Sequence, residues 1–241
     1  MKRLKALKVL CVFAVVFCFA AKGYAASPEK VFVVDGENWV LKSGGEPEGS
    51  CGASLEQGMY WYAVDPDSDE AAKGLRRGVL LYDAEGEKYS FLPTDEEQIR
   101  VENVTFSPDK KRMVLSANIN RFASGLWVYD VETLELERAF WGYSDVFFVD
   151  DVRFAFTLVD EKTERPQQAG MWGISAALYE PAEEKGYVVL KGATAKENFS
   201  VTGAGESEIT VNVTSVKSEK DWEDIEKWND SEITLEVPAA G

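Results

Sequence analysis

The sequence predicts an all-β fold, a small β-propeller-like array of four or five four-stranded blades with a short helix near the C-terminus. The first observation is a recurring strand-and-turn segment that ends on a tyrosine followed by an acidic residue, at Tyr82, Tyr129 and Tyr179. These tyrosines are 47 and 50 residues apart, and one four-stranded propeller blade takes about 40 to 50 residues. The second observation is that runs rich in β-branched and aromatic residues alternate with turn residues along most of the chain.

The first 25 residues have the pattern of a secretory signal peptide. Four basic residues precede an apolar run of thirteen residues, 9–21, and the small residues Gly23 and Ala25 stand where a signal peptidase cuts. We expect cleavage after Ala25 and a single domain over residues 26–241. The apolar run is shorter than the roughly 20 residues that span a bilayer, and an uncleaved anchor is the alternative. The protein is therefore expected to be periplasmic or secreted in a bacterium, without membrane insertion after cleavage.

The strands are expected in four groups that follow one another along the chain. The groups are 31–34, 59–64, 78–82 and 88–92; 101–106, 112–117, 125–129 and 134–140; 145–160, 172–178 and 186–190; and 199–202, 208–216 and 231–237. Turn residues separate the strands, as at Ser107, Pro108 and Asp109, where proline presets the backbone angle of a type I turn. The first group is long for one blade, so a partial fifth blade near residues 44–57 is the alternative.

The second group carries a family resemblance. Residues 106–113 read Phe-Ser-Pro-Asp-Lys-Lys-Arg-Met, and residues 126–133 read Leu-Trp-Val-Tyr-Asp-Val-Glu-Thr. This pair resembles the β-propeller repeat of the periplasmic translocation protein of the Tol-Pal system and of Trp-Asp-repeat proteins. Lys110 stands where those repeats prefer glycine. The resemblance covers residues 101–140 and implies a scaffold for binding. It implies no particular reaction, because propellers serve both enzymes and interaction modules.

The charge of the chain restricts its partners. Without the first 25 residues, 21 Lys and Arg face 42 Asp and Glu, so the net charge is near −21. A surface this acidic repels phosphate backbones and anionic membrane faces. We therefore expect no nucleic-acid partner. The expected partner of this monomer is another envelope or secreted protein, or a glycan.

Histidine and cysteine usage removes several catalytic classes. The chain has no histidine, which excludes Ser/His and Cys/His nucleophile pairs and histidine-ligated zinc or copper. Cys51 alone remains after cleavage, so no intramolecular disulfide forms. No histidine can activate the Cys51 thiol. We expect a structural or loop thiol there, with bonding to a partner as the alternative.

Three alternating aspartates suggest a calcium loop. Asp65, Asp67 and Asp69 lie in one short segment, and calcium prefers several oxygen ligands from such a turn. The pattern is incomplete, since Glu70 stands where the bend needs glycine and Arg76 where a glutamate closes the site. The segment is interpreted either as a calcium site or as an exposed acidic loop. No other cofactor is expected.

Residues 221–228 have the pattern of a short helix. Asp221 is a suitable cap, and Trp222, Ile225 and Trp228 fall along one side at a spacing of three. Two roles are open for this stripe. It packs on the last blade, or it docks a partner through Trp222 and Trp228.

Paired carboxylates are the remaining catalytic apparatus, with Asp150 and Asp151 as the example. Glycosidases hold two carboxylates at a defined separation, whereas adjacent residues of a strand point to opposite faces. We therefore expect a noncatalytic binding or assembly module, with a carboxylate-based carbohydrate hydrolase as the alternative function. A β-sandwich or another β-rich fold in which the period is coincidental is the alternative fold.

Overall fold

The computed structural model describes residues 30–35, 38–43, 51–54, 58–64, 77–83, 85–86, 88–94, 100–120, 123–159 and 173–239. The chain divides into two compact units, Met1–Glu48 with Pro66–Leu75, and Gly49–Asp65 with Arg76–Gly241. In the first unit, β1 (Lys30–Asp35) and β2 (Asn38–Ser43) form an antiparallel hairpin. The predicted signal peptide, residues 1–25, lies outside the described residues.

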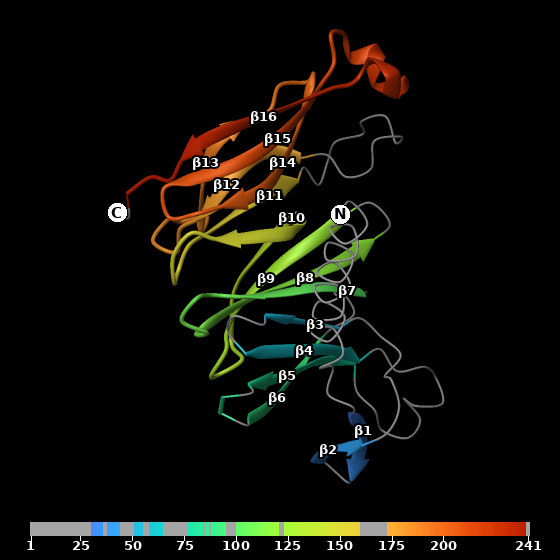
Figure 1. Cartoon of the computed structure of the whole chain (residues 1–241), viewed down its shortest axis with the longest axis vertical. Helices are drawn as coiled ribbons and strands as arrows, with labels where there is room; N and C mark the ends of the chain where they lie inside the picture. The colour runs from blue at the N-terminus through green and yellow to red at the C-terminus, as the bar shows by residue number, and fades with distance from the viewer. Residues whose placement is uncertain are drawn as a thin grey trace, which may run out of the picture. The chain divides into compact units, whose positions relative to one another are not determined.

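The second unit is built from antiparallel sheets in chain order (Figure 1). The first sheet has the order β3-β4-β5-β6, with β3 (Cys51–Ser54), β4 (Met59–Val64), β5 (Gly78–Asp83) and β6 (Lys88–Pro93). The second has seven strands: β7 (Arg100–Phe106), β8 (Arg112–Asn120), β9 (Ala123–Asp130), β10 (Leu136–Phe148), β11 (Phe154–Val159), β12 (Gly173–Tyr179) and β13 (Tyr187–Gly192). The third comprises β14 (Glu197–Ala204), β15 (Glu208–Ser215) and β16 (Asn229–Glu236).

The seven-stranded sheet consists of two four-stranded groups that share β10. Residues 136–141 of β10 pair with β9, and residues 142–148 pair with β11, with a register shift between Gly142 and Val146. The group β7–β10 corresponds to the four strands predicted over 101–140. The prediction that the fourth strand ends at Phe140 is wrong, because the bulge allows one strand to continue and pair on both sides.

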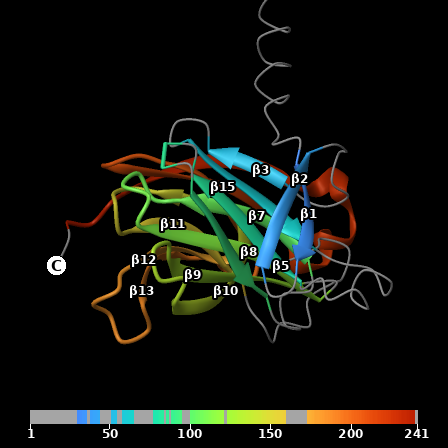
Figure 2. The ribbon, with the colours of Figure 1, turned by 90° about the horizontal axis from the view of Figure 1, so that it is seen from below.

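Alternating side chains pack these groups face to face. Figure 2 shows the ribbon from below, with several of the sheets lying over one another. In β8, Met113, Leu115 and Ala117 join a cluster with residues of β4 and β5, while Val114 joins a cluster with residues of β11 and β12. This division follows from the two-residue period of a strand. In β11, Phe154 faces the preceding group and Ala155 faces β14 and β15. Adjacent groups are therefore packed in chain order, like the blades of a propeller.

Only one face of the sheet β14–β16 packs on another sheet within the described part of the chain. Phe199, Val201, Ile209 and Val211 are buried against β11 and β12. The alternate residues of β15 are polar and partly or fully exposed, as its burial pattern shows. The outer face of this sheet is therefore hydrophilic.

The strand connections fall at two ends, which we call the turn end and the loop end. The turn end carries the hairpins 107–111, 131–135, 149–153 and 180–186. At the loop end, β4, β11 and β15 finish and β5, β12 and β16 begin. The connection between β15 and β16, residues 216–228, is described throughout and is thirteen residues long. The equivalent β8–β9 connection has two residues, 121–122.

The segment predicted as a short helix contains two 3-10 turns, Glu219–Glu223 and Ile225–Lys227, in place of one continuous helix. Asp224 between them has extended backbone angles, and its side chain accepts a hydrogen bond from the amide of Glu226. This bond starts a new turn instead of continuing the old one. Among the described residues, no helix is both long and apolar enough to cross a membrane.

Candidate binding surface at the loop end

Aspartates at the turn end are engaged in holding the hairpins. Asp83 accepts from the amide of Glu85 (3.1 Å), and Asp130 accepts from the amides of Glu132 (2.9 Å) and Thr133 (2.8 Å). Both aspartates follow a tyrosine of the recurring segment, so the acidic residue of that repeat closes a turn. The amide and hydroxyl of Thr133 are the main reason that the pKa of Asp130 is lowered, against a smaller effect of burial.

Asp150, predicted as half of a catalytic pair, is engaged in the same way. One carboxylate oxygen accepts from the amides of Val152 (2.8 Å) and Arg153 (2.7 Å), and the other accepts from the Arg153 guanidinium (2.6 Å). Partial burial by itself would raise the pKa of Asp150, but these bonds outweigh it and lower the pKa. A general acid needs the opposite shift. Asp151 is exposed to solvent.

The arginines at the turn end link strands that are distant in sequence. Arg153 is largely buried and also donates to the carbonyl of Pro238 (2.8 Å). Arg112 stands at the equivalent position of the preceding group and donates to Glu137 (2.9 Å), which also accepts from the hydroxyl of Tyr179 (3.2 Å). Burial, reinforced by Glu137, raises the pKa of Tyr179 to about 12. These contacts support the fold.

The loop end carries a polar cluster on three neighbouring strands, β7, β8 and β9. Asn118 donates to one oxygen of Glu102 (2.8 Å), and the hydroxyl of Ser124 donates to the other (3.0 Å). Glu102 is exposed, whereas Ser124 is fully buried. A buried hydroxyl therefore fixes a carboxylate at the surface, which gives the cluster a defined geometry.

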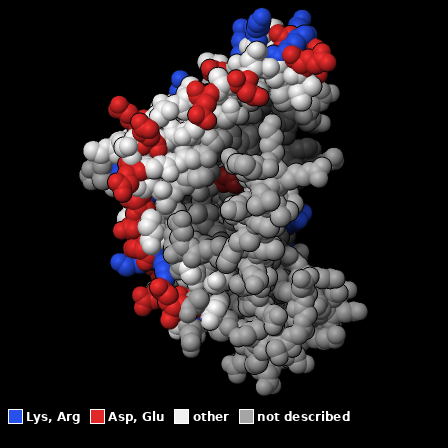
Figure 3. Space-filling view, viewed as in Figure 1, with Lys and Arg blue, Asp and Glu red and all other residues white. Residues whose placement is uncertain are grey.

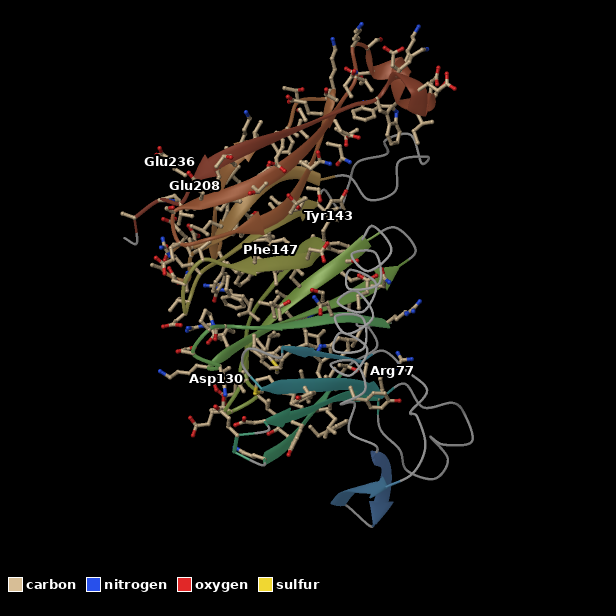
Figure 4. The ribbon with its side chains drawn as sticks, in the orientation of Figure 1. Arg77, Asp130, Tyr143, Phe147, Glu208 and Glu236 are labelled. Atoms are coloured by element: carbon tan, nitrogen blue, oxygen red, sulfur yellow. The ribbon has the colours of Figure 1, made fainter. Side chains whose placement is uncertain are left out.

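A second polar group joins β10, β12 and β14 near the same end. The amide of Gly173 donates to the side-chain oxygen of Asn198 (2.7 Å). Tyr143 lies beside them, and Figure 4 labels it on β10. Burial raises the pKa of Tyr143 to about 12, although its hydrogen bonds with Gly173 and Asn198 act to lower it. Tyr143 is therefore neutral at physiological pH.

The β15–β16 connection is anchored by its two tryptophans. Trp222 is 3% exposed, its ring nitrogen donates to the carbonyl of Ala195 (3.2 Å), and it packs with Trp228, Val216 and Ile174. The two indole rings meet edge to face with centroids 5.6 Å apart. The sequence leaves two roles open for this stripe, packing and docking. These contacts show that Trp222 packs within the protein. The docking role stays a prediction.

Two groups of this connection are unusual in their surroundings. Ile225 is 72% exposed, which is unusual for a large aliphatic side chain in a segment that is otherwise charged. The ring nitrogen of Trp228 is buried and has no hydrogen-bond partner within the described structure. An unpaired buried donor costs about 1–3 kcal/mol, so this indole lowers the stability of the connection.

Two predicted features are not settled by these contacts. Asp65, Asp67 and Asp69 lie outside the described residues, so the calcium site stays a prediction. In the parts of the chain that the structure describes, no three His, Cys, Asp or Glu side chains gather as metal ligands. Cys51 is the first residue of β3, and its side chain lies outside the described part.

The polar groups around Glu102 and Tyr143 are not predicted from the sequence. Their members are separated by up to 55 residues and are brought together only by sheet pairing and stacking. The available signal was a polar residue near the same end of three successive strands, at Glu102, Asn118 and Ser124.

Acidic and basic side chains are distributed unevenly over the described surface. Figure 3 shows carboxylates along one margin of the visible face and a mixed group of basic and acidic side chains near the 3-10 turns. There Lys227 lies 3.4 Å from Asp221 and 3.3 Å from Asp224. Because Lys227 is exposed, this ion pairing contributes little to stability. The segment that contains Ile225 therefore carries charges of both signs.

No protein family model matches the chain, and no curated protein matches it. Among solved structures it is similar to the β-propeller domain of the Trilobed protease from Pyrococcus furiosus, with 10% identity and a TM-score of 0.49 over 82% of this chain and 56% of that one. It is also similar to TolB from Acinetobacter baumannii, with 15% identity and a TM-score of 0.46 over 88% of this chain and 50% of that one. A chain of the mitotic checkpoint complex matches with 15% identity and a TM-score of 0.41, covering 68% and 45%.

This chain therefore spans about half the length of the structures it resembles. Their TM-scores lie below 0.5, so the propeller-like description depends on the stacking of this chain's own sheets. Fold and surface together define an all-β protein of stacked antiparallel sheets, with hydrogen-bonded hairpins at the turn end and the β15–β16 connection at the loop end.

Proposed function

We propose that this is an exported noncatalytic protein, a binding or assembly module on a β-propeller-like scaffold. Residues 1–25 are its signal peptide, and residues 26–241 form the exported domain, in the bacterial periplasm or outside the cell. The blades are β3–β6, β7–β10, β10–β13 and β14–β16. The observation that carries the proposal is the difference between the two ends of the sheets: turn-end aspartates are engaged in the fold, whereas the loop end has the β15–β16 connection, residues 216–228, with the exposed Ile225. Such connections are where binding residues concentrate.

The partner that fits the loop end is another envelope or secreted protein, or a glycan. An exposed aliphatic side chain in a segment that carries charges of both signs is a feature that a partner surface complements. The net charge near −21 opposes nucleic acid. Calcium bound by Asp65, Asp67 and Asp69 remains part of the proposal.

The test is capture of a partner from envelope and culture-fluid extracts by the chain from Ala26 onward, with calcium and with chelator. Ile225→Asp introduces a charge at the loop end, and Leu136→Asp introduces the same charge at the turn end, where Leu136 is 52% exposed. We expect Ile225→Asp to reduce capture at least tenfold and Leu136→Asp to leave it unchanged, since both sites tolerate exposure. Loss of capture on chelation would support the calcium site.

Two results would contradict the proposal. Equal capture by both variants would remove the loop end as the binding surface. Turnover of a glycoside that is abolished by Asp150→Ala or Asp151→Ala would show the carbohydrate hydrolase instead.

A further inference from the structure

The third sheet has three strands where the other groups have four. Its order is β14-β15-β16, so β16 lies at its margin. Within the described residues, no strand pairs with the outer edge of β16. Of the eight residues of β16, six are exposed, and an open edge of this kind presents unpaired backbone groups to a second strand.

The pairing with β15 determines which backbone groups face outward. The register is regular from Glu208 opposite Glu236 to Ser215 opposite Asn229. The amide of Val237 donates to the carbonyl of Ser207 (2.9 Å), so the backbone groups of Val237 face β15. Because the direction alternates along a strand, the amides and carbonyls of Asp230, Glu232, Thr234 and Glu236 point away from β15.

The two faces of β16 differ in chemistry. The four residues with outward backbone groups also place their side chains on the hydrophilic face, and three of them are acidic. Glu236 lies directly opposite Glu208 there, and Figure 4 labels both. On the other face, Ile233, Leu235 and Val237 are partly buried at the margin of the core shared with β11 and β12. An incoming strand would meet carboxylates on one face and an apolar strip on the other.

We propose that the outer edge of β16 accepts a fourth strand from a partner protein, an extended segment that alternates lysine or arginine with aliphatic residues. The basic residues pair with Asp230, Glu232 and Glu236, the aliphatic residues extend the strip of Ile233 and Leu235, and the backbone bonds continue the ladder. This surface is separate from the loop end and does not depend on it.

Charge decides between this occupant and a second copy of the chain. Two β16 edges brought together would set acidic side chains against acidic side chains, which is destabilising across a strand pair. The net charge near −21 adds repulsion between copies. The acidic edge therefore disfavours self-association and favours a basic segment.

The probe is a synthetic, end-blocked heptapeptide with lysine at positions 1, 5 and 7, threonine at position 3 and valine at positions 2, 4 and 6. In antiparallel pairing its lysines face Glu236, Glu232 and Asp230, and its threonine faces Thr234. Binding to the chain from Ala26 onward is measured by fluorescence anisotropy. We expect binding that weakens with added salt and at least tenfold weaker binding of a matched peptide with glutamate in place of lysine.

Thr234→Pro tests the backbone ladder. It removes one outward amide without touching the bonds to β15, and proline is tolerated at an edge. We expect at least a tenfold loss of binding, while Thr234→Ala, which keeps the amide, retains it. If Thr234→Pro proves unstable in a thermal melt, the double variant Asp230→Lys with Glu232→Lys replaces it. We expect this double variant to bind the glutamate peptide more tightly than the lysine peptide.

Equal binding to Thr234→Pro and the unchanged chain would overturn the proposal, as would equal binding of the two peptides. Slow hydrogen exchange at the amides of Glu232 and Thr234 without peptide would also overturn it, because another strand would already cover the edge. Protection that depends on protein concentration would identify a second copy, and protection that does not would identify a segment of the same chain.

Discussion

Asp150 and Asp151 are adjacent and identical in type, yet their surroundings give them different roles. Asp150 accepts two backbone amides and the Arg153 guanidinium, while Asp151 is exposed. Lys110 is a second such case. Its φ of 61° lies in the left-handed region, which explains why the repeats it resembles prefer glycine there. Its ammonium group contacts Glu85 of the neighbouring sheet, which gives lysine a role that glycine lacks.

Asp150→Ala should lower the free energy of unfolding by about 1–2 kcal/mol, because the turn loses its acceptor and Arg153 loses its partner. Asp151→Ala is the matched control, with a change within about 0.5 kcal/mol. The folded pKa of Asp150 is lowered, so its contribution is present above the unfolded pKa of about 3.9 and is lost as pH falls through the folded pKa. Urea unfolding at pH 7 and pH 3 measures both effects. A similar cost for both variants at pH 7 would contradict this account.

At the scale of elements, the close approach of β12 and β14 depends on Gly173. A Cβ atom there would lie 1.9 Å from the carbonyl oxygen of Phe199 and 2.6 Å from a methyl carbon of Thr157. The same junction is held by a bond from the Val201 amide to the Thr157 hydroxyl (2.8 Å) and by the Gly173–Asn198 bond. Glycine at this position therefore permits the third sheet to pack on the second.

Gly173→Ala should destabilise the protein by about 3 kcal/mol or more, because backbone on both strands must move. Gly205→Ala is the control, since a Cβ at Gly205 meets nothing within 4 Å. Thermal unfolding of both variants measures the difference, and near-native stability of Gly173→Ala would show that the two strands separate at little cost.

At the scale of the described sheets of the second unit, the stack is an array in which each group contacts its neighbours. Phe154 stacks on Tyr179 with ring centroids 4.8 Å apart inside the second cluster, whereas Ile209 belongs to the interface of the last sheet. In such an array, stability is approximately a sum of nearest-neighbour interfaces.

Native-state hydrogen exchange should therefore distinguish two core truncations that each cost about 2–5 kcal/mol. Ile209→Ala should reduce protection mainly in β14–β16, and Phe154→Ala should reduce it on both sides of the second cluster, from β8 to β12. Uniform loss of protection in both variants would show that the stack unfolds as one cooperative block.

Local sequence was sufficient for the group β7–β10 except for the end of β10, which continues past Phe140. Its strands are neighbours in the chain, joined by connections of two to five residues, and alternation together with turn residues determines such pairing. The first predicted group, 31–93, was assigned to one long unit, but the structure separates the β1–β2 hairpin from β3–β6. Strand β3 lies within residues 44–57, where a further blade was the alternative.

By itself, the sequence determined the all-β class, the positions of most strands and the chemistry excluded by the lack of histidine, because these depend on composition and on neighbours in the chain. Only the tertiary structure decided that β10 serves two groups and that Asp150 supports a turn. It also brought Glu102, Asn118 and Ser124 into one cluster, and no described strand pairs with the outer edge of β16. These features arise from contacts between residues far apart in the chain, and the two-residue period of a strand indicates which face is buried without indicating what lies against it.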